Sequence, residues 1–170
     1  NQVLEQINTT ITASSSLNYG NIYYISAASG NNTTAMKGDP QKPYATFAAV
    51  AALYQDGEVI HVLDGTANAT SVTNLNNKTN IKIILNESTT LQNFSYVPTV
   101  TGFDVSIFGN GQVTGGGVTT SLTKIGDYNV NVDSILEHFI VNHGGNIHFE
   151  CNYLELNSQN SVQYADNSLV

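Results

Sequence analysis

Short apolar segments recur along this chain at a spacing that suits the coils of a solenoid. Their centres lie roughly 17 to 25 residues apart, at Ile60, Ile83, Ile107, Val130 and Ile147. Sequences rich in Gly and Asn separate them, namely Asn76-Asn77, Gly109-Asn110-Gly111, Gly115-Gly116-Gly117 and Asn142-His143-Gly144-Gly145. Residues of these types favour turns. The pattern therefore predicts strands that alternate with turns and stack in successive coils.

Weaker strand-like segments lie between these centres. They are found near Thr89–Leu91, Gln112–Thr114, Leu136–Val141 and Tyr153–Leu156. The repeats are uneven and differ in sequence, which favours a parallel β-helix over a solenoid with a strict repeat. An antiparallel β-sandwich would also place short strands at this spacing. Spacing alone leaves both folds open.

The stretch from Gly20 to Thr66 contains the one convincing helix expected inside the body of the chain. A strand is predicted at Ile22–Ser26, followed by a polar loop at Ala27–Gln41. The helix is predicted at Phe47–Tyr54, and a second strand at Glu58–Leu63. This order of elements encloses the helix between two strands.

The predicted helix has one apolar face and a defined start and end. Phe47, Val50, Leu53 and Tyr54 fall on that face at helical spacing. Thr46 suits the N-cap position, because its hydroxyl can accept an unpaired amide. A parallel stack leaves unpaired backbone groups at its end, and we expect the helix to lay its apolar face over the first coil and close that end. The predicted structural cap consists of Tyr24, Gly38, Pro43, Thr46, Phe47, Val50, Tyr54, Gly57 and Gly65.

Several ordered features of this stretch carry a family resemblance. They are Tyr-Tyr-Ile-Ser at 23–26, Ser-Gly-Asn at 29–31, Gly-Asp-Pro at 38–40, Lys-Pro-Tyr-Ala-Thr-Phe at 42–47, Asp-Gly at 56–57, Val-Ile-His-Val-Leu at 59–63 and Asp-Gly-Thr at 64–66. In this order they resemble the N-terminal module of right-handed parallel β-helix proteins of the pectin-lyase-like type. The resemblance implies an all-β, right-handed parallel β-helix with a short N-terminal capping α-helix, spanning residues 20–170 and continuing beyond 170.

The resemblance implies a fold more than a chemistry. Such modules occur in polysaccharide lyases and hydrolases, in bacterial surface proteins, and in phage tailspikes and fibres. The net charge of -8 and the absence of arginine argue against nucleic acid and anionic membranes as partners. No apolar run reaches membrane-spanning length. A single cysteine, Cys151, excludes an internal disulfide.

Carboxylates are the first candidates for chemistry, because polysaccharide enzymes use them in pairs. Asp104, Asp127, Asp133, Glu137, Glu150 and Glu155 are spread over successive predicted coils. Two of them could align by stacking, but none forms a local pair, and no arginine is present to bind a uronate. We therefore predict no catalytic residues, with the region beyond residue 170 left open.

Histidines and aromatic residues give no stronger signal. The histidines are His61, His138, His143 and His148. His148 and Glu150 share a strand face, but a metal site needs a third ligand, and Cys151 points to the opposite face. The tyrosines considered for sugar stacking are Tyr23, Tyr24, Tyr128, Tyr153 and Tyr164, and their scatter favours packing roles. We predict no metal, no cofactor, and glycine clusters that act as turns.

Residues 1–19 differ from the rest of the chain. Val3, Leu4, Ile7 and Ile11 recur at three- and four-residue spacings, which suits one face of a short helix. We interpret this segment as a docking or trimerising element, and the alternatives are a tail packed on its own domain or a disordered tail. No matching cover is visible after Tyr153–Leu156, so we expect the stack to continue or another subunit to cover it.

Together with these features, the resemblance implies a structural virion protein. The chain would be the N-terminal part of a phage fibre or tailspike-like appendage, a homotrimer that contacts other virion proteins through its N-terminal segment. A distal region would bind a host surface glycan. The alternatives are a bacterial surface adhesin or carbohydrate-binding β-helix at the cell surface, and the non-catalytic start of a polysaccharide lyase or glycosidase.

Overall fold

The computed structural model describes residues 19–70, 72–119, 126–143, 145–155 and 161–164, and for 19, 119, 137–143 and 161–164 only the backbone. The predicted docking residues Val3, Leu4, Ile7 and Ile11 lie outside the described residues. The elements, in chain order, are η1 (Tyr19–Asn21), β1 (Ile22–Ser26), α2 (Phe47–Ala51), β2 (Val59–Asp64), β3 (Thr66–Asn68), η2 (Thr73–Leu75), β4 (Asn80–Leu85), β5 (Thr90–Tyr96), β6 (Phe103–Gly109), β7 (Gln112–Thr119), β8 (Gly126–His143), β9 (Ile147–Leu154) and β10 (Ser161–Tyr164).

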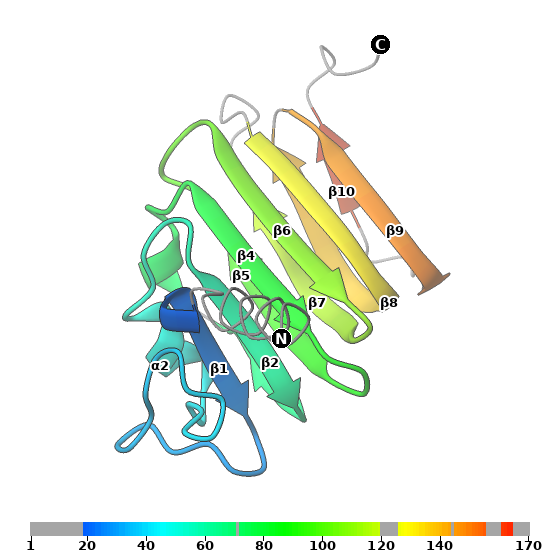
Figure 1. Cartoon of the computed structure of the whole chain (residues 1–170). Coiled ribbons are helices and arrows are strands. Elements are labelled where there is room, and N and C mark those ends of the chain that lie inside the picture. Colours follow the sequence, from blue (N-terminus) through cyan, green and yellow to red (C-terminus); the bar gives the residue numbers. More distant parts are fainter. Residues whose placement is uncertain (1–18, 71, 120–125, 144, 156–160, 165–170) are drawn as a thin grey trace, which may run out of the picture.

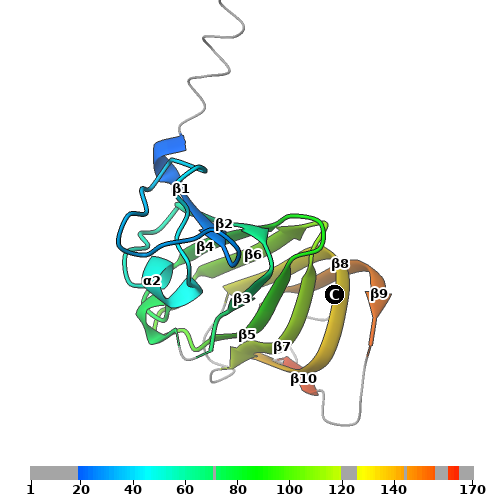
Figure 2. The same ribbon diagram turned by 90° about the horizontal axis from the view of Figure 1, so that it is seen from below.

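The strands form a parallel β-solenoid. The sheet order is β1-β2-β4-β6-β8-β7-β5-β3, with β9 and β10 both paired to β8. Every pairing between named strands is parallel. One face carries β1, β2, β4 and β6, the opposite face carries β3, β5 and β7, and the long β8 runs from the first face to the second (Figures 1 and 2). The predicted parallel β-helix is confirmed, and the antiparallel sandwich is excluded.

The register of the first face follows the predicted strand centres. Ile60 pairs with Ile83, Ile83 with Ile107, and Ile107 with Val130. All four side chains point inward and are almost fully buried. In β9 the partner of Val130 is Phe149, while Ile147 pairs with Tyr128. The last predicted centre, Ile147, therefore lies two residues before Phe149, the residue that pairs with Val130.

The core lies between the two faces and is closed by aromatic contacts. Phe94 and Tyr96 reach it from β5, and both are buried. The Phe94 ring meets Phe47 of α2 edge-on at 6.2 Å, and the Tyr96 ring meets Phe103 of β6 at 5.5 Å. These contacts join the helix, the second face and the first face into one core.

The helix is shorter than predicted, which changes the position of one residue. It spans Phe47–Ala51, and Phe47 and Val50 are fully buried as expected. The Leu53 amide bonds the carbonyl of Val50, a tighter turn than an α-helix makes, so helical spacing no longer holds at Leu53. Leu53 is 49% exposed, and its predicted place on the apolar face is wrong.

The triple glycine is part of a strand and not a turn, contrary to the prediction. Gly115, Gly116 and Gly117 lie inside β7, all with positive φ. The preceding coil bends at Asn93 (φ 55), one residue before the pair Phe94–Gly116. The glycines therefore allow β7 to follow the bend of β5. The predicted turn at Asn142–Gly145 is also wrong in part, since β8 extends to His143.

Candidate functional site

The loop before α2 covers the outer edge of β1. The Gly38 amide donates to the Ile22 carbonyl at 2.8 Å. The Tyr44 amide donates to the Tyr24 carbonyl at 2.7 Å, and the Ser26 amide donates back to the Tyr44 carbonyl at 3.0 Å. Backbone groups that would otherwise be unpaired at the end of the stack are thus satisfied by this loop, and not by the helix to which the sequence analysis assigned that role.

The predicted cap residues take defined places around this loop. Thr46 is the N-cap of α2, and its Oγ1 accepts the Ala49 amide at 3.3 Å. Tyr24 is buried against the ring of His61 at 5.6 Å. Pro43 immediately precedes Tyr44, whose backbone pairs with Ile25. Gly57 donates to the Asn80 carbonyl at 3.3 Å, and Gly65 packs against Ala27 with no room for a Cβ.

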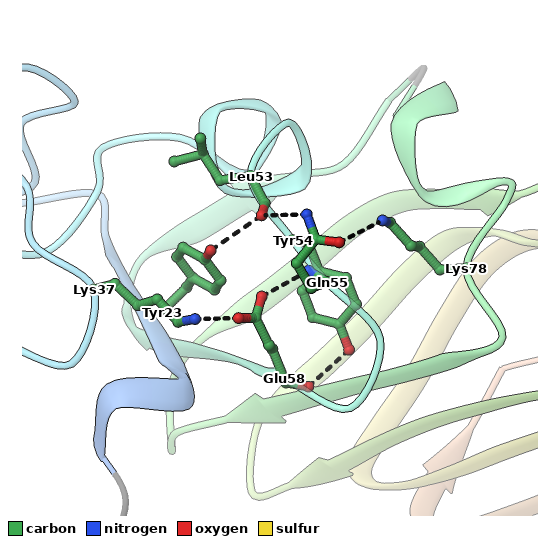
Figure 3. A network of polar contacts seen from close by, with 7 residues as sticks. All are labelled: Tyr23, Lys37, Leu53, Tyr54, Gln55, Glu58 and Lys78. Carbon is green, nitrogen blue, oxygen red and sulfur yellow. Dashed lines mark hydrogen bonds and ion pairs between the residues drawn. The ribbon is translucent and has the colours of Figure 1, made fainter.

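A polar network lies under the cap and holds the loop, the turn after α2 and the first coil together (Figure 3). The Lys37 ammonium forms an ion pair with Glu58, whose other carboxylate oxygen accepts the Gln55 amide at 2.6 Å. The Tyr23 hydroxyl donates to the Leu53 carbonyl at 3.1 Å. Tyr54 Oη lies 2.7 Å from the Glu58 carbonyl oxygen. These groups are occupied with one another, so the network is a structural element.

Burial raises the pKa of the tyrosines in and near this core. For Tyr23 burial is the main cause and the nearby Glu58 carboxylate adds to it, which brings the pKa to about 12. Burial likewise raises the pKa values of Tyr54, Tyr96 and Tyr128 above 10.0. All these side chains are at least 95% buried.

Alkaline pH is expected to destabilise the fold. In the unfolded chain these tyrosines ionise near the ordinary pKa of 10.0, whereas the folded chain keeps them protonated. Their stabilising contribution is therefore complete below pH 10.0 and falls as pH rises towards the folded pKa, by up to about 1.4 kcal/mol per group per pH unit. The free energy of urea unfolding at increasing pH measures this. Tyr23→Phe should make the decline shallower, and a constant free energy between pH 10.0 and about 12 would contradict the expectation.

The structure aligns two of the candidate carboxylates in neighbouring strands. Asp104 of β6 pairs in register with Asp127 of β8 on the outer side of the first face. Asp104 accepts from the Ser106 hydroxyl at 3.1 Å, and Asp127 accepts from the Asn146 amide at 2.9 Å. The sequence indicated that two of the candidate carboxylates could stack, but it did not indicate which two. Each carboxylate is held by a neutral donor.

Asparagine amides also hold two further carboxylates between β8 and β9. Asn131 donates to Glu150 at 2.6 Å, and Asn152 donates to Asp133 at 3.1 Å. His148 and Glu150 share a face as predicted, with Nε2 and Oε2 3.9 Å apart. Among the described residues, no three His, Cys, Asp or Glu side chains are placed to hold a metal ion.

Of the remaining candidates, Cys151 is partly buried, Glu155 is exposed, and four have side chains that are not described. Cys151 faces inward and is partly buried, and burial together with the Asp133 charge raises the pKa of its thiol. Glu155 donates its backbone amide to the Ile135 carbonyl at 3.0 Å. Nothing is described for the side chains of Glu137, His138, His143 and Tyr164.

Two adjacent hollows, which sequence reasoning missed, lie at the corner where the first face turns into the second. The first has a volume of about 240 Å³, and its polar lining is Asn110, Asn131, Asp133, Glu150 and Asn152. The second has a volume of about 410 Å³, and its polar lining includes Glu87, Thr90, Gln112, Asp133 and Ser134. Because Asp133 lines both, we treat them together as the corner groove.

Two exposed aromatic side chains lie next to the corner groove. Phe108 is 39% exposed and is the register partner of Asn131. Tyr153 is 57% exposed and is the register partner of Ser134. Tyr153 therefore does not pack in the core. The alternation of side chains along β6 is a sequence signal that places Phe108 on the outer face. The exposed fraction of each ring has no such signal, because it depends on how far the neighbouring coils cover the ring.

Comparison with known proteins identifies no relative of this chain. No protein-family model, no curated protein and no solved structure matches it. The pectin-lyase-like resemblance and the link to phage appendages thus stay predictions. In the part of the chain that the structure describes, no helix is long and apolar enough to cross a membrane.

Proposed function

We propose that this chain is a structural β-helix module of a virion appendage. It would form the N-terminal part of a fibre or tailspike-like protein and anchor a distal region that binds the host receptor. The cell surface, for an adhesin with the same fold, is the alternative location. The observation that carries the proposal is the difference between the two ends of the stack.

At the β1 end the backbone edge is covered, whereas at the β9 end the core-facing side chains are less well covered. Ile147, Phe149 and Cys151 of β9 are only partly buried. Their register partners in β8, which are Tyr128, Val130 and Val132, are 3%, 1% and 4% exposed. Partly covered apolar side chains stabilise a stack fully only when another layer packs on them. This supports a module that is extended along the stack axis.

The lateral surface also suits a fibre. Charged residues make up only 11% of the chain, and amide–carboxylate pairs such as Asn146–Asp127 join the coils. Copies with such a surface can lie side by side with less charge desolvation than ion-pair-rich surfaces would require. This supports side-by-side packing of copies in the appendage, which we propose to be a homotrimer.

The location is tested by immunogold electron microscopy. Antibodies raised against this chain should label one end of an appendage on phage particles from the source culture. Antibodies against an unrelated protein serve as the control. Labelling confined to bacterial cell surfaces would overturn the virion proposal in favour of an adhesin.

The isolated chain is expected to be a trimer. Sedimentation equilibrium should give three times the chain mass of 18.2 kDa. If residues 1–19 trimerise the chain, substitution of Ile7 and Ile11 by serine should give a monomer whose β-helix melts at the parent temperature. A parent chain that sediments as a monomer would contradict the trimer.

A further inference from the structure

We propose that the Asn110-Gly111 turn is a site of spontaneous chemical modification, at which the asparagine converts to aspartate and isoaspartate through a cyclic imide. The turn joins β6 to β7, and Asn110 lines the first hollow of the corner groove. The inference rests on which groups of the turn are hydrogen-bonded and on the space around Gly111. It concerns the chemistry of a single chain and does not depend on the proposed virion function.

Packing against the preceding coil requires a glycine after Asn110. A Cβ at Gly111 would lie 2.6 Å from the Leu85 Cβ and 2.6 Å from the Thr89 Oγ1. A residue without a side chain also leaves its own amide nitrogen open to approach. The close contact between the coils therefore places, directly after Asn110, the residue that hinders ring closure least.

The turn is held at both ends, while the two groups that must react are left unpaired. The Asn110 backbone amide donates to the Leu85 carbonyl at 3.0 Å. The Gln112 backbone amide donates to the Thr89 carbonyl at 2.8 Å. Within the part of the chain that the structure describes, the Gly111 amide between them donates to no group, and the exposed Asn110 side chain makes no hydrogen bond. The nucleophile and the electrophile of the reaction are thus both available.

The reaction needs no partner other than water. The Gly111 nitrogen forms a bond to Cγ of Asn110, and the Cγ–Nδ2 bond breaks as ammonia leaves with the proton of the Gly111 amide. Water then opens the imide at one of its two carbonyl carbons and returns a proton to the nitrogen. Opening at Cγ gives aspartate, whereas opening at the main-chain carbonyl gives isoaspartate. Because the two reacting groups are neighbours in one chain, the ring closure is intramolecular.

Two Asp-Gly pairs, at 56–57 and 64–65, could form the same imide, but hydrogen bonds hold their carboxylates. Asp56 accepts the backbone amides of Thr79 and Asn80 at 2.7 and 3.0 Å. Asp64 accepts the Ser26 hydroxyl at 2.6 Å. A carboxylate held in this way must break a charge-assisted hydrogen bond before it can turn toward the next amide. The fold therefore leaves the turn between β6 and β7 as the reactive one of the three.

Both products change the corner groove. Aspartate at position 110 adds a carboxylate to the hollow that Asp133 and Glu150 already line, and these charges repel one another. Isoaspartate adds a methylene to the backbone between the two hydrogen bonds that hold the turn, so the turn should lose at least one of them. We therefore expect the modified chain to unfold at a lower urea concentration than the unmodified one.

Peptide mapping by mass spectrometry tests the site, after incubation of the whole folded chain at mildly alkaline pH and enzymatic methylation to detect isoaspartate. Asn110 should convert at a rate similar to that in the chain denatured with guanidinium. The folded chain should become more negative by one charge than its formal value of -8. Asp56 and Asp64 should isomerise at least about tenfold more slowly in the folded than in the denatured chain, since each must first release a hydrogen bond to a charged group.

Asn110→Gln provides the matched variant, because it keeps the amide but would have to close a larger ring. It should remove the modification at this turn and the accompanying change in charge. Protection of Asn110 by about tenfold or more in the folded chain relative to the denatured chain would overturn the proposal. Equal isomerisation of Asp56 and Asp64 in the two states would also overturn it, as would an unchanged gain of charge in the Asn110→Gln chain.

Discussion

Replacing Phe47 by aspartate is expected to unfold the first coil. Phe47 is fully buried at the start of α2, with its ring against Phe94 of β5. Loss of a buried phenylalanine costs about 3–5 kcal/mol, and a carboxylate without a partner in this apolar site costs more. Because small domains have only about 5–15 kcal/mol of stability, the loss should be evident in urea unfolding followed by circular dichroism.

Leu53→Asp is the matched control for this variant. It places the same charge a few residues along the chain, at a side chain that is 49% exposed. We expect a change within about 0.5 kcal/mol, as for other surface substitutions. If Phe47→Asp and Leu53→Asp unfold at the same urea concentration as the parent, the helix is not part of the core.

Gly116→Ala is expected to destabilise the coils strongly. A Cβ at Gly116 would lie 2.1 Å from the Phe94 carbonyl oxygen of the preceding coil. The Cβ is fixed to the backbone of Gly116, which pairs in register with Phe94, so the two atoms cannot move apart without disturbing the ladder. The residue also has φ +88, which side-chain-bearing residues rarely adopt. We expect a loss of about 3 kcal/mol or more, measured by urea unfolding.

Gly57→Ala separates the two causes of that loss. Gly57 has φ +83, close to that of Gly116, but a Cβ there would meet no atom within 4 Å. It should therefore cost only the backbone strain, about 1–2 kcal/mol. Equal losses at Gly116 and Gly57 would indicate that the coils can separate to admit a methyl group, and that the tight approach at Gly116 is not needed for stability.

The sequence alone determined the features that depend on neighbouring residues. The β1 strand has the predicted bounds, Ile22–Ser26, because its apolar residues are flanked by turn-forming ones. Thr46 is the N-cap, because its hydroxyl reaches an amide three residues ahead. The column Ile60, Ile83, Ile107 and Val130 was found because coils of similar length place their strand centres in register.

Only the tertiary structure decided features that depend on contacts between coils. Leu53 is exposed because the helix ends at Ala51, and the triple glycine is in a strand because β5 bends beside it. The corner groove needs the register of β6, β7, β8 and β9 together with the depth to which each coil covers the next. Turns of unequal length change how far one coil covers the next, and they leave no periodic pattern in the sequence. The sequence therefore predicted the stack of coils, but it did not predict that Phe108 and Tyr153 are exposed on its surface.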